Sequence, residues 1–474
     1  MLFPTITFAL FLTLVLAVHT VLLSRPKAWK FAMLAASYVF YGWWDWRFLS
    51  LIWLSTVVDY LTGRAIYATE DQQRRRLWLW CSLTTNLGIL GFFKYANFFV
   101  DQFIELFGSL GIDASAGSLR IILPVGISFY TFQTMSYSID IYRRILKPTD
   151  QLLDFALFVG FFPQLVAGPI VRARDFLAQL ATDDRRPIDS GLAIRLILGG
   201  LFKKMVLADV LGAELVDGIF ANPDSATGPE TLLAIYGYAL QIYGDFSGYS
   251  DIAIGVALLL GFRFPANFNQ PYRALSLRDF WRRWHISLSS WLRDYLYIGL
   301  GGSRRGRART MRNLLATMVL GGLWHGAGWT FVLWGLLHGV GLVVERLIWP
   351  EPDPTTASRF SGSRVGRTIR GLITFHIVCA AWVLFRSVNL DRAIEVFGAL
   401  GGPWGSLPTV SLGVTLLLVI GTATQLVPQG RTNVWWEWAA GLPVLVQAAG
   451  ITAAILTFDL LSPDGVKPFL YFAF

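Results

Sequence analysis

The chain has 474 residues, of which 54% are hydrophobic and 15% charged, and its formal net charge is +9. Soluble chains carry about 25% charged residues, whereas here apolar runs of membrane-spanning length recur along the whole sequence. This composition excludes a set of soluble domains and predicts one all-α transmembrane domain over residues 1–474, because spanning backbone must satisfy its own hydrogen bonds. The positive charge does not indicate nucleic-acid binding, since the arginines lie in short segments between apolar runs.

The first predicted span, residues 3–23, is followed rather than preceded by basic residues, so it is interpreted as an uncleaved helix whose N-terminus lies outside. Further spans are expected near residues 31–44, 48–63, 77–97, 121–141, 194–212, 231–258, 327–345, 371–386, 409–427 and 434–458. With this topology the arginine-rich segments all fall on the cytosolic side, and both termini lie outside. They include eleven arginines within 263–312 and five within the cytosolic loop 346–370. This arrangement also requires a short or re-entrant crossing at 313–323.

Three stretches do not have the pattern of simple spans. Residues 151–171 are apolar but are interrupted by Pro163 and Pro169, which break helices. Residues 277–300 place aromatic and aliphatic residues at helical spacing beside arginines, which predicts an amphipathic helix at the membrane interface. Residues 313–329 contain four glycines around one histidine. Irregular backbone at membrane depth is tolerated where it lines a cavity, so a central cavity is expected.

His325 is the strongest candidate for chemistry. It lies in the segment Gly-Gly-Leu-Trp-His-Gly-Ala-Gly-Trp, residues 321–329, where missing side chains allow a ligand to approach the backbone. A neutral imidazole at membrane depth can accept a proton from a hydroxyl group. The alternative is that the glycines only permit close helix packing and that His325 bonds a neighbouring carbonyl; we favour the functional interpretation.

The other four histidines differ in their surroundings. His285, in the segment Trp-Arg-Arg-Trp-His, is interpreted either as part of an anchored interfacial helix or as a second polar group at the cytosolic mouth of the cavity. In the second case a phosphorylated donor would be bound nearby by the residues Arg282, Arg283, Trp284, Arg293 and Trp324. His19 and His376 are expected to be packed or hydrogen bonded, and a direct role for His338 is the less favoured alternative.

Two intramembrane carboxylates, Asp245 and Asp251, form the third polar cluster. Charges at this depth are costly and are usually functional or paired. Six residues of an ideal helix turn the two carboxylates about 120° away from a shared face. We therefore expect each of them to pair with a different arginine and to serve the architecture rather than acid–base chemistry.

Several site classes receive no support. The sequence contains no Walker A loop, no GxSxG elbow and no HExxH motif. The two cysteines, Cys81 and Cys379, offer neither a disulfide framework nor metal-ligand spacing. No metal and no bound cofactor are expected.

Five ordered blocks carry a resemblance to a known family: FVGFFPQLVAGPIVRARDF (158–176), YGDFSGYSDIAIGVALLLGFRFPANFNQPYRA (243–274), LRDFWRRWHISLSSWLRDYLYIGLGGSRRG (277–306), LGGLWHGAGWTFVLWGLLHG (320–339) and AAWVLFRS (380–387), to which the terminal FLYFAF can be added. The chain resembles the membrane-bound O-acyltransferases, in particular their bacterial polysaccharide O-acetylation branch.

The resemblance implies a fold and a reaction. The fold would be a ring of about 11–12 transmembrane or re-entrant helices around a central tunnel, with the catalytic blocks in 158–345. His325 would be the catalytic histidine and His285 the second signature position. The donor would be acetyl-CoA or another acyl thioester on the cytosolic side of a bacterial inner membrane. The acceptor would be an extracellular or periplasmic polysaccharide such as alginate, reached through an exported SGNH-type transferase.

Alternatives of the same chemistry are D-alanyl transfer to teichoic acids and O-acetylation of peptidoglycan. A transporter would show matching irregular helices in two repeats, and no repeat is detectable. The remaining alternative is a non-catalytic scaffold for polysaccharide export.

Overall fold

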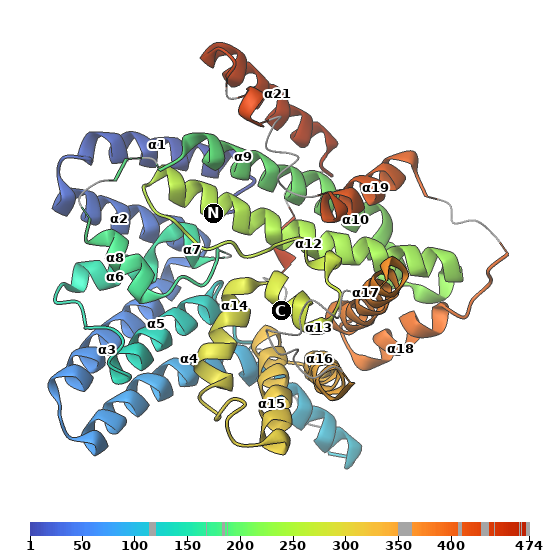
Figure 1. Cartoon of the computed structure of the whole chain (residues 1–474), viewed down its shortest axis with the longest axis horizontal. Coiled ribbons are helices and arrows are strands. Elements are labelled where there is room, and N and C mark those ends of the chain that lie inside the picture. Colours follow the sequence, from blue (N-terminus) through green and yellow to red (C-terminus); the bar gives the residue numbers. More distant parts are fainter. Residues whose placement is uncertain are drawn as a thin grey trace. The chain divides into compact units, whose positions relative to one another are not determined.

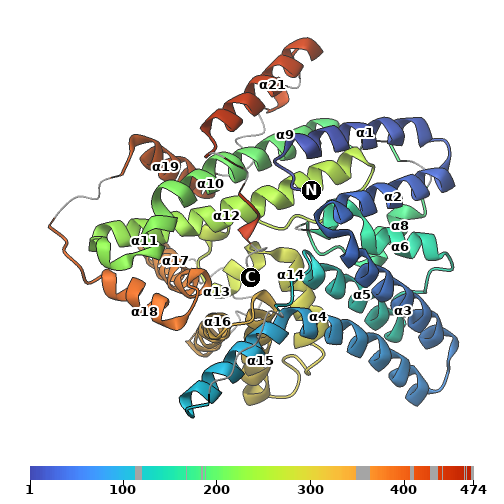
Figure 2. The same ribbon diagram turned by 180° about the vertical axis from the view of Figure 1, so that it is seen from behind.

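The computed structural model describes residues 1–112, 120–166, 168–182, 185–186, 188–348, 363–405, 410–427, 436–439, 441–463, 465 and 467–470 (Figures 1 and 2). The chain divides into two compact units. Unit 1 contains residues 1–193 and 253–265, and unit 2 contains residues 194–252 and 266–474. Every regular element in the described residues is helical, as the composition predicts.

Unit 1 contains the helices α1 (Ile6–Leu22), α2 (Pro26–Asp45), η1 (Trp46–Phe48), α3 (Leu49–Ala68), α4 (Gln72–Ser109), α5 (Ile127–Tyr142), α6 (Leu152–Gly160), α7 (Phe162–Leu165) and α8 (Ala173–Leu180). The first five predicted spans correspond to α1–α5, although α4 is much longer than its expected span. Helix α1 begins where Thr5 Oγ1 accepts a hydrogen bond from the backbone N–H of Phe8. The next helix, α2, begins at a proline, which needs no N–H partner at that position.

Polar side chains join α3, α4 and α5, which lie side by side in both views (Figures 1 and 2). The buried Asp59 carboxylate of α3 accepts hydrogen bonds from Ser82 and Asn86 of α4 and from Ser138 of α5, the last two at 2.7 and 2.8 Å. Burying a carboxylate is costly unless its oxygens are bonded. These bonds therefore fix the packing of three apolar helices that hydrophobicity alone would orient only weakly in lipid.

The helix break predicted within 151–171 is present. Helix α6 ends at Gly160, Phe161 adopts an extended ψ of 112°, and α7 follows with Pro163 in its first turn. Residue 167 lies outside the described residues. Almost the whole of this stretch is buried inside unit 1, so its irregular backbone is covered by protein.

The boundaries between the two units fall within two helices, α9 (Ser190–Leu201) and α12 (Gly228–Leu259). The other elements of unit 2 are η2 (Phe202–Ala208), α10 (Asp209–Leu211), η3 (Gly212–Val216), α11 (Asp217–Ala221), η4 (Pro223–Ser225), η5 (Pro271–Arg273), α13 (Leu277–Arg283), α14 (Ile286–Trp291), η6 (Leu292–Tyr297), α15 (Arg307–His325), α16 (Trp329–Ile348), α17 (Arg364–Arg386), α18 (Leu390–Ala399), α19 (Leu412–Leu426) and α21 (Val444–Leu461). Three of these, η2, η3 and η6, are π-helical. The π-helix is rare in proteins overall, and where it does occur it is often at a functional site.

The prediction of one amphipathic interfacial helix over residues 277–300 is wrong in two respects. The stretch breaks at Trp284 and His285 into α13 and α14 and then continues as the π-helical η6. Its aromatic face, including Trp284 and Trp291, is buried within the protein. The apolar residues do share a buried face, but protein rather than lipid covers it.

The prediction of irregular backbone across residues 313–329 is also wrong. Residues 307–325 form one continuous helix, α15, and only residues 326–328 separate it from α16. Glycine lowers helix propensity by about 1 kcal/mol per residue, and here tertiary packing outweighs that cost.

Three described helices, α16, α17 and α21, are long and apolar enough to cross a membrane, and α1 and α19 are shorter apolar helices. The last predicted span, 434–458, is shifted: α21 begins at Val444 and ends at Leu461. Residues 349–362 of the predicted cytosolic loop lie outside the described residues.

Candidate active site

His325 is the last residue of α15, in a tight hairpin that α15 forms with α16 (Figure 1). Glycines make the close approach possible. A Cβ atom at Gly322 would lie 2.2 Å from the Phe331 carbonyl oxygen, and one at Gly335 would lie 2.4 Å from the Met318 carbonyl oxygen. The glycines therefore serve helix packing, which was the structural alternative for this motif, and by doing so they fix where His325 lies.

Aromatic rings enclose the His325 imidazole, whose residue is only 4% exposed. Its centroid is 5.0 Å from those of Trp324 and Trp334 and 5.3 Å from that of Phe385, with interplanar angles of 73–82°. Edge-to-face contacts of this kind are favourable and directional. They hold the imidazole in one orientation within a dry environment.

His285 lies at the break between α13 and α14, with a positive φ of 42°. A left-handed conformation is uncommon for a residue with a Cβ, and it persists only where the surroundings enforce it. Asn267 does so from both its backbone and its side chain. Its carbonyl oxygen accepts from the Ile286 N–H at 2.9 Å, and its side-chain Oδ1 lies 3.1 Å from His285 Nδ1.

The same contacts determine the tautomer of His285. The backbone N–H of Ser287 donates to the Asn267 Oδ1 position at 3.2 Å, so the atom at that position must be the amide oxygen. An amide oxygen only accepts, and therefore His285 Nδ1 carries the proton. The amide nitrogen of Asn267 donates to Ser250 Oγ at 3.0 Å, which is consistent with this assignment. The basic nitrogen of the neutral His285 ring is then Nε2.

Trp324 lies between the two histidines of the sequence motifs. Its indole centroid is 6.2 Å from that of His285 and 5.0 Å from that of His325. Phe246 of α12 contacts the other side of His285 at 4.5 Å. The structure therefore brings His285 and His325 to one aromatic cluster, although they are 40 residues apart in the sequence.

The arginines predicted to bind a donor do not join this cluster. Arg283 Nε donates to Asp279 at 2.8 Å, and Arg293 Nε donates to its neighbour Asp294 at 2.7 Å. Arg282 is exposed. Trp284, predicted beside them, is buried against Phe280, Phe268 and Trp382 instead.

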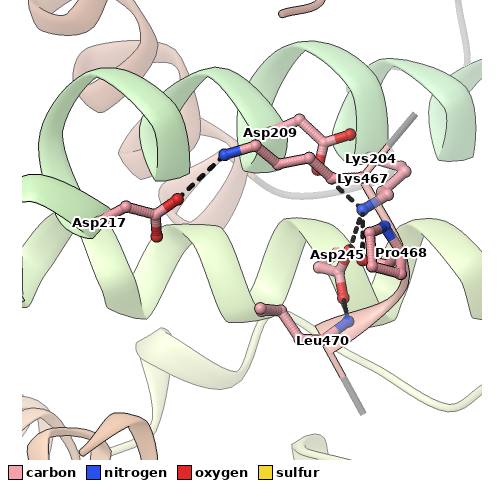
Figure 3. A network of polar contacts seen from close by, with 7 residues as sticks. All are labelled: Lys204, Asp209, Asp217, Asp245, Lys467, Pro468 and Leu470. Atoms are coloured by element: carbon pink, nitrogen blue, oxygen red, sulfur yellow. Dashed lines mark hydrogen bonds and ion pairs between the residues drawn. The ribbon is translucent and has the colours of Figure 1, made fainter. Parts of the chain in front are cut away.

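Asp245 and Asp251 are paired as expected, but with lysines rather than arginines. Lys203 contacts Asp251, and Lys204 Nζ lies 2.7 Å from Asp245 and 2.8 Å from Asp209 (Figure 3). Both lysines, which are adjacent in η2, contact carboxylates of α12. Lys204 is 1% exposed, so its charge is compensated almost entirely by these two carboxylates.

The described C-terminal residues complete this ionic network. The Leu470 N–H donates to the second oxygen of Asp245 at 2.9 Å, and Lys467 pairs with Asp217 at 3.0 Å (Figure 3). Phe469 is fully buried and contacts Phe246, the ring that touches His285. The network therefore supports the histidine cluster from the side of α12.

The remaining histidines lie elsewhere. His19 accepts a hydrogen bond from Trp29 Nε1 at 2.9 Å in unit 1. His376 Nε2 is 2.7 Å from the Tyr236 hydroxyl, and its Nδ1 is 2.7 Å from the Leu372 carbonyl oxygen. Both are hydrogen bonded, as expected. His338 lies on α16 against Trp334.

Comparison with known proteins identifies the family. The model of the MBOAT, membrane-bound O-acyltransferase family, matches residues 38–354. Among similar proteins, the probable alginate O-acetylase AlgI of Azotobacter vinelandii is 45% identical over 82% of this chain and 76% of its own length. The protein of the same name from Pseudomonas putida is 38% identical over 98% of both chains.

A relative whose name gives a different substrate is also similar. The peptidoglycan O-acetyltransferase of Helicobacter pylori is 39% identical over 80% of this chain and 74% of its own length. The family match covers more than half of the chain and includes both motif histidines. This chain therefore belongs to the membrane-bound O-acyltransferase family and is a polytopic membrane O-acyltransferase.

Proposed function

We propose that this enzyme transfers an acetyl group from acetyl-CoA for the O-acetylation of an extracellular or periplasmic polysaccharide of the alginate type. The observation that carries the proposal is the meeting of His285 and His325 on the Trp324 indole. Relatives at 38–45% identity that bear the name alginate O-acetylase support the choice of acyl group and acceptor.

His325 acts as the general base in this proposal. It takes the proton of an acceptor hydroxyl while that oxygen attacks the thioester carbonyl carbon, so that a C–O bond forms as the C–S bond breaks. The coenzyme A thiolate leaves and takes the proton from the His325 imidazolium, which restores the neutral base. The aromatic walls exclude water, which would otherwise hydrolyse the thioester.

His285 orients the reacting groups. With its Nδ1 proton committed to Asn267, its Nε2 can accept a hydrogen bond from a second donor group of the substrates, while the single proton of the attacking hydroxyl goes to His325. A fixed tautomer is what such a role requires, since the other tautomer would present an N–H donor at Nε2 instead.

The donor approaches from the cytosolic side of the bacterial inner membrane, where Arg282, Arg283 and Arg293 meet its phosphates and Trp324 bounds the thioester. In this proposal the acceptor hydroxyl belongs to the exported SGNH-type transferase, which becomes acetylated and then passes the acetyl group to a hydroxyl of the polysaccharide. Both termini lie outside in this topology.

The test is the acetate content of the secreted polysaccharide in cells that carry His325→Ala, with membrane abundance of the protein measured in parallel. Acetylation should disappear while the protein remains inserted. The matched control is His376→Ala, which removes a hydrogen-bonded histidine on α17 and should leave acetylation unchanged. Normal acetylation in the His325→Ala cells would remove the general-base assignment, and it is also the result expected of a scaffold or a transporter.

A second acceptor, peptidoglycan, is favoured by the relative named for it. Measuring acetate separately in secreted polysaccharide and in purified peptidoglycan distinguishes the two. Ester-linked D-alanine in either fraction would instead indicate the D-alanyl branch of the family.

A further inference from the structure

His338 is a fully buried residue on α16 that the proposed reaction does not use. Within the described residues, neither of its ring nitrogens has a hydrogen-bond partner. Buried polar groups are nearly always hydrogen bonded, and an imidazole without such bonds destabilises a fold. Hydrogen bonding to the described protein therefore does not account for a histidine at this position.

The contacts that His338 does make are ring contacts. It stacks on Phe280 at 6.0 Å with an interplanar angle of 6°, and it meets Trp281 edge to face at 5.1 Å. It also meets Trp334, one helical turn earlier on α16, at 5.0 Å and 70°. The ring is thus held by α13 on one side and supports the Trp334 indole on the other.

The same indole contacts the proposed general base. Trp334 lies 5.0 Å from His325 at 82°, so one tryptophan has edge-to-face contacts with both imidazoles. Gly335 and Gly339 bring α16 into direct contact with α15, so the helix that carries Trp334 is closely packed on the helix that carries His325. The orientation of Trp334 is therefore transmitted to His325.

We propose that His338 is a positioning residue for the transfer reaction, which acts by holding the Trp334 indole against His325. The inference rests on the proposed function, because it assigns His338 a part in the reaction of His325. A general base must reach the hydroxyl within hydrogen-bonding distance, and small displacements of such a group reduce the rate strongly.

The experiment is a double-mutant cycle with His338→Ala, Trp334→Phe and the double variant, each as the full chain in membrane vesicles that also contain the exported transferase. Acetyl transfer from labelled acetyl-CoA to the polysaccharide is measured against donor concentration. We expect His338→Ala to lower kcat between about fivefold and a hundredfold, with KM for the donor unchanged. In the Trp334→Phe background the same change should have little further effect, because the indole that transmits it is gone.

His338→Phe separates support from chemistry. Phenylalanine keeps a ring against Trp334 and should regain most of the kcat that alanine loses, whereas His376→Phe should change nothing. A phenylalanine variant as inactive as the alanine variant would show that the nitrogens of His338 take part directly, and would overturn the positioning role.

The outcomes are also distinguishable from failure of the proposed function. Wild-type vesicles that transfer no acetyl group would refute both ideas together. Wild-type vesicles that are active, combined with effects of His338→Ala and Trp334→Phe that multiply, would refute only the coupling through Trp334. Where His338→Ala does not accumulate in membranes, His338→Leu fills the same space without a ring and takes its place.

Discussion

Asn267→Leu removes the group that fixes His285 while keeping a side chain of similar size. Asn267 Oδ1 accepts from His285 Nδ1, from the Ser287 N–H at 3.2 Å and from the Ser287 hydroxyl at 2.9 Å. The hydroxyl can rotate to another acceptor, but the other two donors cannot. A buried donor left without a partner costs about 1–3 kcal/mol, so the variant should lose about 2–6 kcal/mol in free energy of unfolding.

The kinetic effect comes from the imidazole alone. If the His285 bond contributes about 1–3 kcal/mol to holding Nε2 in place for the transition state, its loss lowers kcat about 5- to 150-fold. Acetyl transfer in membrane vesicles measures this effect, and thermal unfolding of the solubilised protein measures the stability.

The matched variant is Asn267→Asp, which keeps an acceptor for His285 and Ser287, loses the donor to Ser250 and introduces a carboxyl group beside His285. It should retain far more activity than Asn267→Leu. Equal activity in the leucine variant and the wild type, together with a lowered unfolding temperature, would mean that Asn267 serves only the fold and that the tautomer of His285 has no part in transfer.

Two further predictions concern a buried ion pair and the packing of two helices. Lys204→Met leaves two buried carboxylates uncompensated and should lower the free energy of unfolding by about 3–5 kcal/mol. Lys203→Met removes the lysine of a more exposed pair and should lower it less. Unfolding of the solubilised variants measures both effects. Gly322→Ala places a methyl group 2.2 Å from the Phe331 carbonyl oxygen and should lower both membrane abundance and activity. Gly218→Ala, where the added atom meets nothing within 4 Å, should leave both unchanged. Full activity of Gly322→Ala would contradict the close packing of α15 on α16.

The sequence predicted the helical class and the positions of most helices, because apolar runs of this length have few other solutions. It also singled out His325 and His285, but it did not reveal their meeting on one indole. That meeting depends on the break at His285 and on α15 remaining helical to its last residue. Both features are decided by tertiary contacts. Asn267 fixes the break at His285, and the close packing of the α15–α16 hairpin keeps α15 helical.

The prediction that Asp245 and Asp251 pair with arginines was wrong because the wrong kind of cation was considered. The expected partners of Asp245 were arginines, because the arginines are numerous nearby. Lys203 and Lys204, adjacent within an apolar run, were the signal that was missed, since cations at membrane depth need partners as much as carboxylates do. Asn267 could have been noticed as a polar residue between a helix end and Pro271, but its contact with His285 could not.

The lysine–aspartate pairs have a consequence for how the protein enters the membrane. Each lysine at the centre of a helix opposes insertion by about 2.5–3.5 kcal/mol on translocon scales, so a nascent segment containing both would be held back if it were presented alone. Their partners on α12 follow 41 and 48 residues later in the chain. The two segments are therefore expected to leave the translocon together, as a hairpin that is neutralised before it meets lipid.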